Sequence, residues 1–390
     1  MKERVSIGLP QISANVNYTN YPSLPTSLIP AEFIGGNEGD FIEVEFGTKN
    51  NVSAKIDLYQ KVFDGAYLVG VKAAKVYEDL TRSRAALSEQ DIKYNIAKAY
   101  YTALIAREQE RVTKKNIANI EKLHYETSEM NKQGFVEEIE VDRLQISLSN
   151  LQATLENAEK QTLLAHNLLK FQMNMPLENE IILTDSILGL LSEDDLLLDS
   201  DVDFMQRQEF KVLDVQKNIN EINIKYMKSQ YLPNLSLFAT YEQAAQRNKF
   251  DFFKTGEDYP WFQTALVGID LHIPIFDGRY KNAKVQQARL QLENIKLQEK
   301  ETILALSLEA AQAKTDYQIA VKQIESRREN LELAQKVYAV TVTKYQEGIG
   351  SSLEVTDAER QLLQSQSHMV AALYDLLNAK TDLMKAAGKL

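Results

Sequence analysis

Two carboxylates stand where a long helix is expected to begin. Glu354 and Asp357 lie in the run LEVTDA, directly after the turn residues Gly348–Gly350. Carboxylates grouped at a constriction attract cations and disfavour anions. A helix dipole also stabilises any carboxylate in the first helical turn, so the pattern alone requires no functional role.

The other residues that could carry chemistry are scattered. The histidines share no ligand spacing, and they are His124, His166, His272 and His368. The glycines Gly348 and Gly350 fall between two predicted helices and not after a strand, so they do not form a phosphate-binding loop. No nucleophile arrangement is visible. The sequence therefore predicts no enzyme, no cofactor and no metal site.

The composition excludes several classes of protein. The chain has 390 residues, a net charge of -11, 15 Gly, 8 Pro and no Cys. No basic cluster interrupts the negative charge, which argues against nucleic acid binding. Disulfides and thiolate metal sites are excluded. No stretch approaches the roughly 18 apolar residues of a membrane helix, so any membrane crossing must be made by strands.

The chain contains two copies of one unit. DLYQKVFDG at Asp57–Gly65 returns as DLHIPIFDG at Asp270–Gly278, and LPQISANVNY from Leu9 returns as LPNLSLFATY from Leu232. Further on, Gly134 to Val141 match Gly348 to Val355. Chance similarity between amphipathic helices does not explain matched Pro, Asp and Gly positions. We therefore expect a duplicated order of strand, long loop, strand, very long helix, glycine turn and second helix.

Four segments of about ten residues alternate between apolar and polar side chains. They are predicted as strands 9–20, 50–60, 233–243 and 262–273. This period and length are typical of outer-membrane barrel strands, although a half-buried soluble sheet alternates in the same way. The joining segments Asn20–Lys49 and Glu242–Pro260 are expected to be long irregular loops, which favours the membrane. Four strands cannot close a barrel, so several chains would have to contribute.

Between the strands lie segments typical of helical rods. Residues 64–132 and 278–346 contain no Pro and would each form a helix of roughly 100 Å at 1.5 Å per residue. Residues 138–173 and 352–388 are predicted as the return helices, and 206–231 as a further helix. An apolar stripe stepping by three and four predicts a coiled-coil seam, with Leu306, Ala310, Ala313, Tyr317, Ala320 and Ile324 on one rod, Leu144, Leu148 and Leu151 on one return helix, and Ala358, Leu362 and Met369 on the other.

The chain resembles the TolC family of bacterial outer-membrane efflux proteins over nearly its whole length. The resemblance rests on Leu9-Pro10 and Leu232-Pro233, on PIFDG ending at Gly278 with its weaker partner KVFDG ending at Gly65, and on KYQEG followed by LEVTDA. It implies a homotrimer in which three chains pool four strands each into a twelve-stranded β-barrel, continued across the periplasm by a hollow barrel of coiled-coil helices.

The same resemblance implies a function and its partners. The protein would be the exit duct of a tripartite efflux or type I secretion system, passing small molecules or proteins. It would lie in the lipid of the outer membrane and join an inner-membrane pump through a periplasmic adaptor, also called a membrane fusion protein.

The resemblance also assigns roles to residues near the turns 133–137 and 347–352. Glu354 and Asp357 match the acidic gate residues, and Glu140 and Tyr345 match the latch, whose basic partner is replaced here by Gly350. The expected adaptor contacts are Gly134, Phe135, Gly348 and Ile349, although each glycine would also serve to end its helix.

The repeat divides the chain at residues 203 and 204. The first repeat, 1–203, includes an equatorial segment 174–203 and lacks the leading helix that 206–231 provides in the second repeat, 204–390. We therefore expect the chain to be truncated at its N-terminus. The competing interpretation is a soluble coiled-coil scaffold whose β-hairpins bind a partner.

Overall fold

The computed structural model describes residues 1–185, 187 and 204–390, and these form two compact units. The first unit comprises Met1–Leu80 with Val215–Lys296, and the second Thr81–Asp214 with Leu297–Leu390. Each unit thus combines matching segments of both sequence copies. The division into repeats 1–203 and 204–390 stays a prediction. Of the expected equatorial segment 174–203, residues 186 and 188–203 lie outside the described part.

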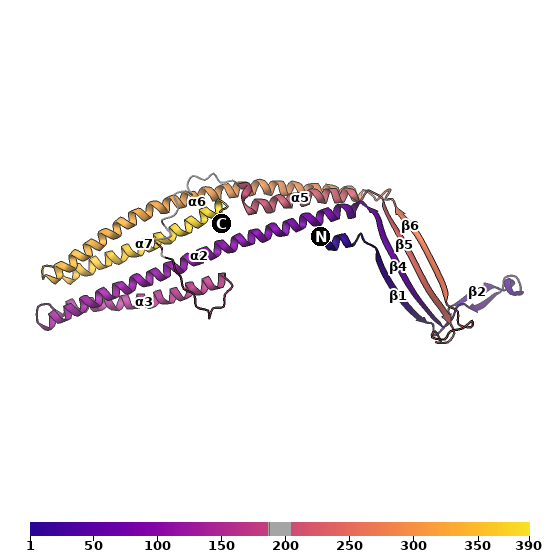
Figure 1. Cartoon of the computed structure of the whole chain (residues 1–390), viewed down its shortest axis with the longest axis horizontal. Helices are drawn as coiled ribbons and strands as arrows, with labels where there is room; N and C mark the ends of the chain where they lie inside the picture. Colours follow the sequence, from indigo (N-terminus) through magenta and orange to yellow (C-terminus); the bar gives the residue numbers. More distant parts are fainter. Residues whose placement is uncertain (186, 188–203) are drawn as a thin grey trace. The chain divides into compact units, whose positions relative to one another are not determined.

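The first unit is built on a four-stranded antiparallel sheet (Figure 1). Its strands are β1 (Gln11–Asn20), β4 (Asn50–Asp64), β5 (Asn234–Arg247) and β6 (Phe262–His272), in the order β1-β4-β5-β6. The two central strands therefore come from different sequence copies. Both outer edges, on β1 and β6, have no strand beside them among the described residues.

The strand register brings the apolar faces into phase. Ile12 lies opposite Leu58, Leu58 opposite Ala239, and Ala239 opposite Val267. Directly opposed residues of an antiparallel sheet project from the same face. One face is thus apolar across all four strands, and the charged side chains Lys55, Asp57, Glu242 and Asp270 project from the other.

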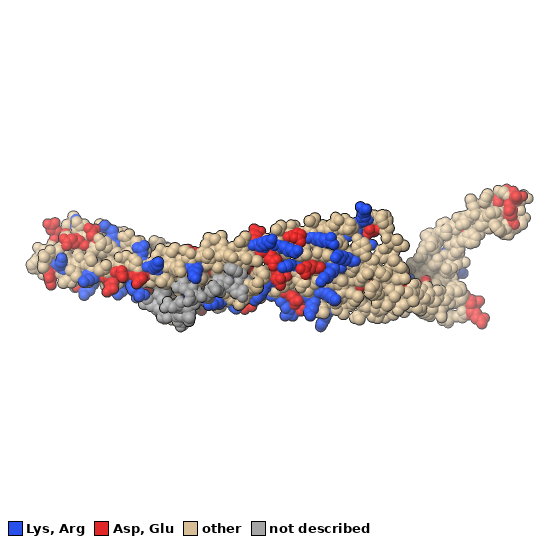
Figure 2. Space-filling view, turned by 90° about the horizontal axis from the view of Figure 1, so that it is seen from above, with Lys and Arg blue, Asp and Glu red and all other residues tan. Residues whose placement is uncertain are grey.

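The segment expected as an irregular loop between β1 and β4 contains a second sheet. Strands β2 (Thr26–Pro30) and β3 (Phe41–Glu45) pair as a hairpin, with the short helix η1 (Ala31–Ile34) at its tip. The tip closes because Gly35 and Gly39 adopt φ of 87° and 89°, which suits glycine, and because Glu32 accepts a hydrogen bond from the Gly39 amide at 3.2 Å. The expectation of a wholly irregular loop was therefore wrong. Acidic side chains gather at this tip, at the far right of Figure 2.

The repeated FDG sequence marks the start of a helix. The Asp64 carboxylate accepts hydrogen bonds from the Ala66 and Tyr67 amides at 2.9 and 3.0 Å, at the start of α2 (Gly65–Lys132). Asp277 accepts one from the Lys281 amide at 3.1 Å, at the start of α6 (Tyr280–Gln346). The aspartates thus satisfy amides that have no partner inside the helix.

The second unit consists of two helical hairpins (Figure 1). The distal part of α2 pairs with α3 (Glu138–Gln172), the distal part of α6 pairs with α7 (Ser352–Ala386), and both turns lie at the same end of the unit. Helix α5 (Gln208–Ser229) follows the short η2 (Phe204–Gln206), and α1 (Lys2–Ser6) opens the chain. No helix in the described ranges is both long enough and apolar enough to cross a membrane.

The predicted seam is confirmed by burial over part of its length, whereas its predicted continuation on α6, Leu331, Ala334, Tyr338 and Thr341, is only half-buried. Every stripe residue from Leu306 to Ile324 is at most 8% exposed, as are Leu144, Leu148 and Leu151 on α3 and Ala358, Leu362 and Met369 on α7. Many of these side chains are alanine, so the helices approach closely over a thin core.

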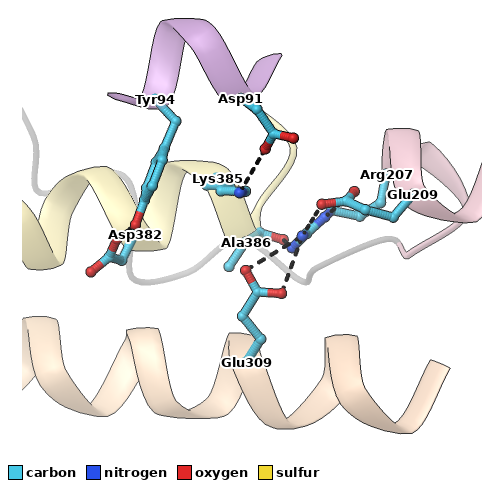
Figure 3. Close-up of polar contacts among 8 residues, drawn as sticks. All are labelled: Asp91, Tyr94, Arg207, Glu209, Glu309, Asp382, Lys385 and Ala386. Atoms are coloured by element: carbon cyan, nitrogen blue, oxygen red, sulfur yellow. Dashed lines mark hydrogen bonds and ion pairs between the residues drawn. The ribbon is translucent and has the colours of Figure 1, made fainter. Parts of the chain in front are cut away.

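A cluster of hydrogen bonds and ion pairs holds the end of α7 that lies far from the turn (Figure 3). Arg207 is 1% exposed and donates to Glu209 at 2.7 Å, to Glu309 of α6 at 3.2 Å and to the carbonyl oxygen of Ala386 at 3.2 Å. Beside it, Lys385 contacts Asp91 of α2 at 2.9 Å. A buried guanidinium requires such partners, and here they come from the start of α5, the interior of α6 and the end of α7.

Candidate functional site at the helix turns

The two hairpin turns have the same backbone geometry. Gly134 and Gly348 both adopt φ of 76°, in the left-handed region. The amide of the next residue then bonds back to the helix: Phe135 to the Met130 carbonyl and Ile349 to the Lys344 carbonyl, both at 3.0 Å. These bonds satisfy carbonyls that the helix end leaves open. Both glycines therefore have the helix-ending role expected of them.

A large apolar side chain projects from each turn. Phe135 is 73% exposed and Ile349 is 76% exposed. Two such side chains at the same end of the unit present a small apolar surface, of the kind that contacts between proteins use. Their expected role as adaptor contacts, together with Gly134 and Gly348, stays a prediction.

Glu140 connects the two hairpins. One of its carboxylate oxygens accepts a hydrogen bond from the backbone amide of Ser352 at 2.8 Å. Ser352 is the first residue of α7, so the negative charge lies at the positive end of that helix. The expected latch residue thus contacts a backbone amide of the other hairpin. Sequence reasoning missed this partner, although the free amides of any helix start could have suggested it.

Tyr345 belongs to the core at the turns. It is 4% exposed and packs with Leu123, Leu144 and Val355. Burial raises the pKa of its phenol, and the charge of Glu140 raises it further. The structure therefore gives Tyr345 a packing position between the hairpins, and its predicted role in a latch remains untested.

The two predicted gate carboxylates are exposed. Glu354 lies in the first turn of α7, where its amide donates to the Ser351 hydroxyl at 3.4 Å, and Asp357 contacts Arg360 at 3.1 Å. An exposed pair of this kind contributes under about 1 kcal/mol. Acidic side chains are prominent around the turns at the left of Figure 2. Both carboxylates therefore lie at the surface, where another molecule could contact them.

A third carboxylate near the turns escaped the sequence analysis. Glu359 of α7 is 4% exposed, and both of its carboxylate oxygens lie 2.8 Å from the Ser147 hydroxyl of α3. Burial raises its pKa. Its position directly after the seam residue Ala358 was the only signal in the sequence.

Comparisons with known proteins agree with this geometry. Residues 206–389 match the family model described as outer membrane efflux protein. The chain is 20% identical over 355 residues to the outer membrane protein TolC of Vibrio cholerae. This match covers 87% of the chain and 77% of TolC. It is 23% identical over 184 residues to the solvent efflux pump outer membrane protein SrpC of Pseudomonas putida, where the match covers 47% of this chain and 38% of SrpC.

Solved structures share the fold along the whole chain. The outer membrane protein VceC of Vibrio cholerae has a TM-score of 0.72 at 16% identity, covering 99% of this chain and 89% of VceC. The outer membrane channel CmeC of Campylobacter jejuni has a TM-score of 0.74 at 16% identity, covering 100% of this chain and 79% of CmeC. Residues 206–389 thus match the outer membrane efflux protein family, and the sheet and two helical hairpins of the chain share the fold of solved outer membrane proteins.

Proposed function

We propose that three copies of this chain form a closed duct through which an efflux or type I secretion system exports its substrate, with a gate at the helix turns. Members of the family are transport ducts of the outer membrane and not enzymes, and the protein lies in that membrane with its helices in the periplasm. The observation that carries the proposal is the sheet: four strands, one apolar face and two open edges.

The sheet supports assembly from several chains. Its apolar face carries aliphatic side chains as exposed as Val16 (74%) and Val267 (82%). A face of this kind suits lipid, and the opposite face, with Lys55, Asp57 and Glu242, suits a wet lumen. Joining β6 of one chain to β1 of the next removes both edges, and three chains give twelve strands.

The helix turns support a gate. In a threefold assembly the exposed Glu354 and Asp357 would supply six carboxylates around the axis, which favours cations at a constriction. Glu140 is already bound to Ser352 within the chain. The ring would therefore be formed by the carboxylates of α7, with Glu140 and Tyr345 holding α7 against the first hairpin.

The exposed tips support contact with other proteins. Phe135 and Ile349 form the apolar part of a surface that a periplasmic adaptor would cover, with Gly134 and Gly348 allowing close approach. The adaptor in turn would join the duct to an inner-membrane pump.

The test is electrical. The purified protein, reconstituted in planar lipid bilayers, is expected to form trimeric channels that favour cations over anions and are blocked by divalent cations. Replacing both ring carboxylates in E354Q/D357N should reduce the cation preference and weaken the divalent block at least several-fold. The matched control is E329Q, which removes one exposed negative charge from α6 away from the turns, and it should leave both properties unchanged.

Two outcomes would contradict the proposal. Unchanged selectivity and block in E354Q/D357N would remove the gate from these residues. A sarkosyl-soluble, non-trimeric product without channel activity would remove the duct and favour the soluble scaffold.

A further inference from the structure

The sequence lacks the basic residue expected to close the gate at the turns, and the structure offers another contact that could do so. Gly350 stands where a basic latch residue was expected, so Glu140 has no basic partner in the turn. Glu140 and Glu359 each accept a hydrogen bond from the opposite hairpin, at Ser352 and Ser147 respectively. The second contact lies deeper and involves a carboxylate removed from water.

The surroundings of Glu359 offset its burial only in part: burial raises its pKa, while the hydrogen bond from Ser147 and the charge of Arg360 lower it. On α3, Ser147 supplies one hydroxyl, which has a single proton to share between two carboxylate oxygens 2.8 Å away. A cleft of about 320 Å³ beside it is also lined by Arg143 of α3 and Arg360 of α7. Arg360, however, contacts Asp357 at 3.1 Å. On α6, the phenol of Tyr338 lies close enough for Glu359 to contribute to its raised pKa, which burial brings to about 12.

A carboxylate in such a place is stabilised by protonation. A neutral carboxylic acid avoids the cost of keeping a charge away from water and can share its proton with Ser147. An ionised Glu359 gains by moving into water, and this movement breaks its contact with Ser147 of α3.

We propose that Glu359 and Ser147 form a proton-dependent clasp between the two hairpins, which holds α7 against α3 when Glu359 is protonated and loosens when it ionises. Because α7 carries Glu354 and Asp357, the clasp would set how readily the gate region moves. The clasp itself does not depend on the proposed function. Only its effect on the gate rests on that function.

The direction of the pH dependence follows from linkage. Burial raises the pKa of Glu359 above the value of 4.5 that it has in water. The closed clasp therefore binds its proton more tightly than the open one, and its stabilisation is complete below pH 4.5. This stabilisation is lost as the pH rises through the raised pKa, so neutral solution loosens the seam.

Hydrogen exchange of the whole protein in detergent tests the clasp. We expect the amides of residues 353–363, corrected for intrinsic exchange rates, to exchange faster at pH 7.5 than at pH 5, because the stabilisation by the protonated carboxyl is lost as the pH rises. The neutral, nearly isosteric E359Q should show the slow exchange of pH 5 at both values. S147A removes the hydroxyl that bonds to the carboxylate, so it should speed exchange at pH 5 and reduce the difference between the two pH values.

The control and the contrary outcomes are distinct. E354Q removes an exposed carboxylate of α7, leaves the Asp357–Arg360 contact intact and should keep the pH dependence of the wild type. Retention of that dependence in E359Q, or faster exchange at pH 5, would overturn the clasp. If E359Q fails to fold, S147A decides, because an unchanged pH difference there overturns it equally. Bilayer recordings on the same samples separate the two proposals, since a protein that forms no channel can still show the exchange effect.

Discussion

The two helical hairpins of the second unit are similar at their turns and different at their ends. Both turns use a left-handed glycine with φ of 76° and the same backbone bonds. Yet α7 begins with a Ser351 hydroxyl that accepts the Glu354 amide, whereas α3 begins after Glu137, whose side chain makes no capping bond. The two turns thus share the backbone geometry and differ in their side chains.

Two carboxylates at matching positions make different contacts. Glu140 and Glu354 occupy matching positions after their glycines, but Glu140 bonds to Ser352 while Glu354 stays exposed. One copy therefore holds the hairpins together, and the other leaves its charge available at the surface. Equivalent positions in a duplicated chain need not have equivalent functions.

The largest difference in stability is expected between the ends of the two hairpins that lie far from the turns. R207M should destabilise the second unit by about 3–5 kcal/mol, because Glu209 and Glu309 lose the guanidinium between them. In the other hairpin, Lys170 is 7% exposed and bonds to the Leu177 carbonyl, and K170M should cost about 1–3 kcal/mol.

Chemical unfolding followed by circular dichroism at 222 nm measures both variants. R207K keeps the charge without the forked geometry and should fall between R207M and the wild type. Equal losses in R207M and K170M would show that the two ends are anchored alike.

The turns themselves should respond alike. Since both glycines have the same φ and an added Cβ would meet no atom within 4 Å at either, G134A and G348A should each cost about 1–2 kcal/mol. The same unfolding assay checks this. A difference above about 1 kcal/mol between the two would mean that one turn adopts another conformation in the assembled protein.

The smallest effect is expected at the helix starts. S351A should cost about 1 kcal/mol by removing the capping hydroxyl, whereas E137A should change stability little. The reciprocal change, E137S, should stabilise α3 by a similar amount. If S351A is silent and E137A is costly, the assignment of the caps is reversed.

Much of the fold could be predicted from periodicity. The seam from Leu306 to Ile324 is buried as expected, because a spacing of three and four has one physical solution in a long helix. The strand alternation was equally clear, and the register adds that all four apolar faces coincide. Local patterns suffice where one repeating interaction dominates.

The rest depends on contacts that no local pattern encodes. The Glu140 bond to Ser352 and the Ser147 bond to Glu359 join residues 212 positions apart, and either glutamate could equally have been solvated. The β2–β3 hairpin was missed because its strands are short and its tip is rich in glycine. Arg207 gave no signal, since its partners come from α6 and from the end of α7.

The open edges of the sheet have a consequence for how the protein reaches its membrane. β1 presents a row of 10 residues and β6 a row of 11, and on the outer side of each no strand among residues 1–185 and 204–390 pairs with the outward-facing peptide groups. Each unpaired peptide group costs several kcal/mol in hydrocarbon. A single chain should therefore be unable to enter the bilayer by itself. Under the proposed assembly of three chains, the rate of insertion should rise with the third power of chain concentration as long as most chains are still single.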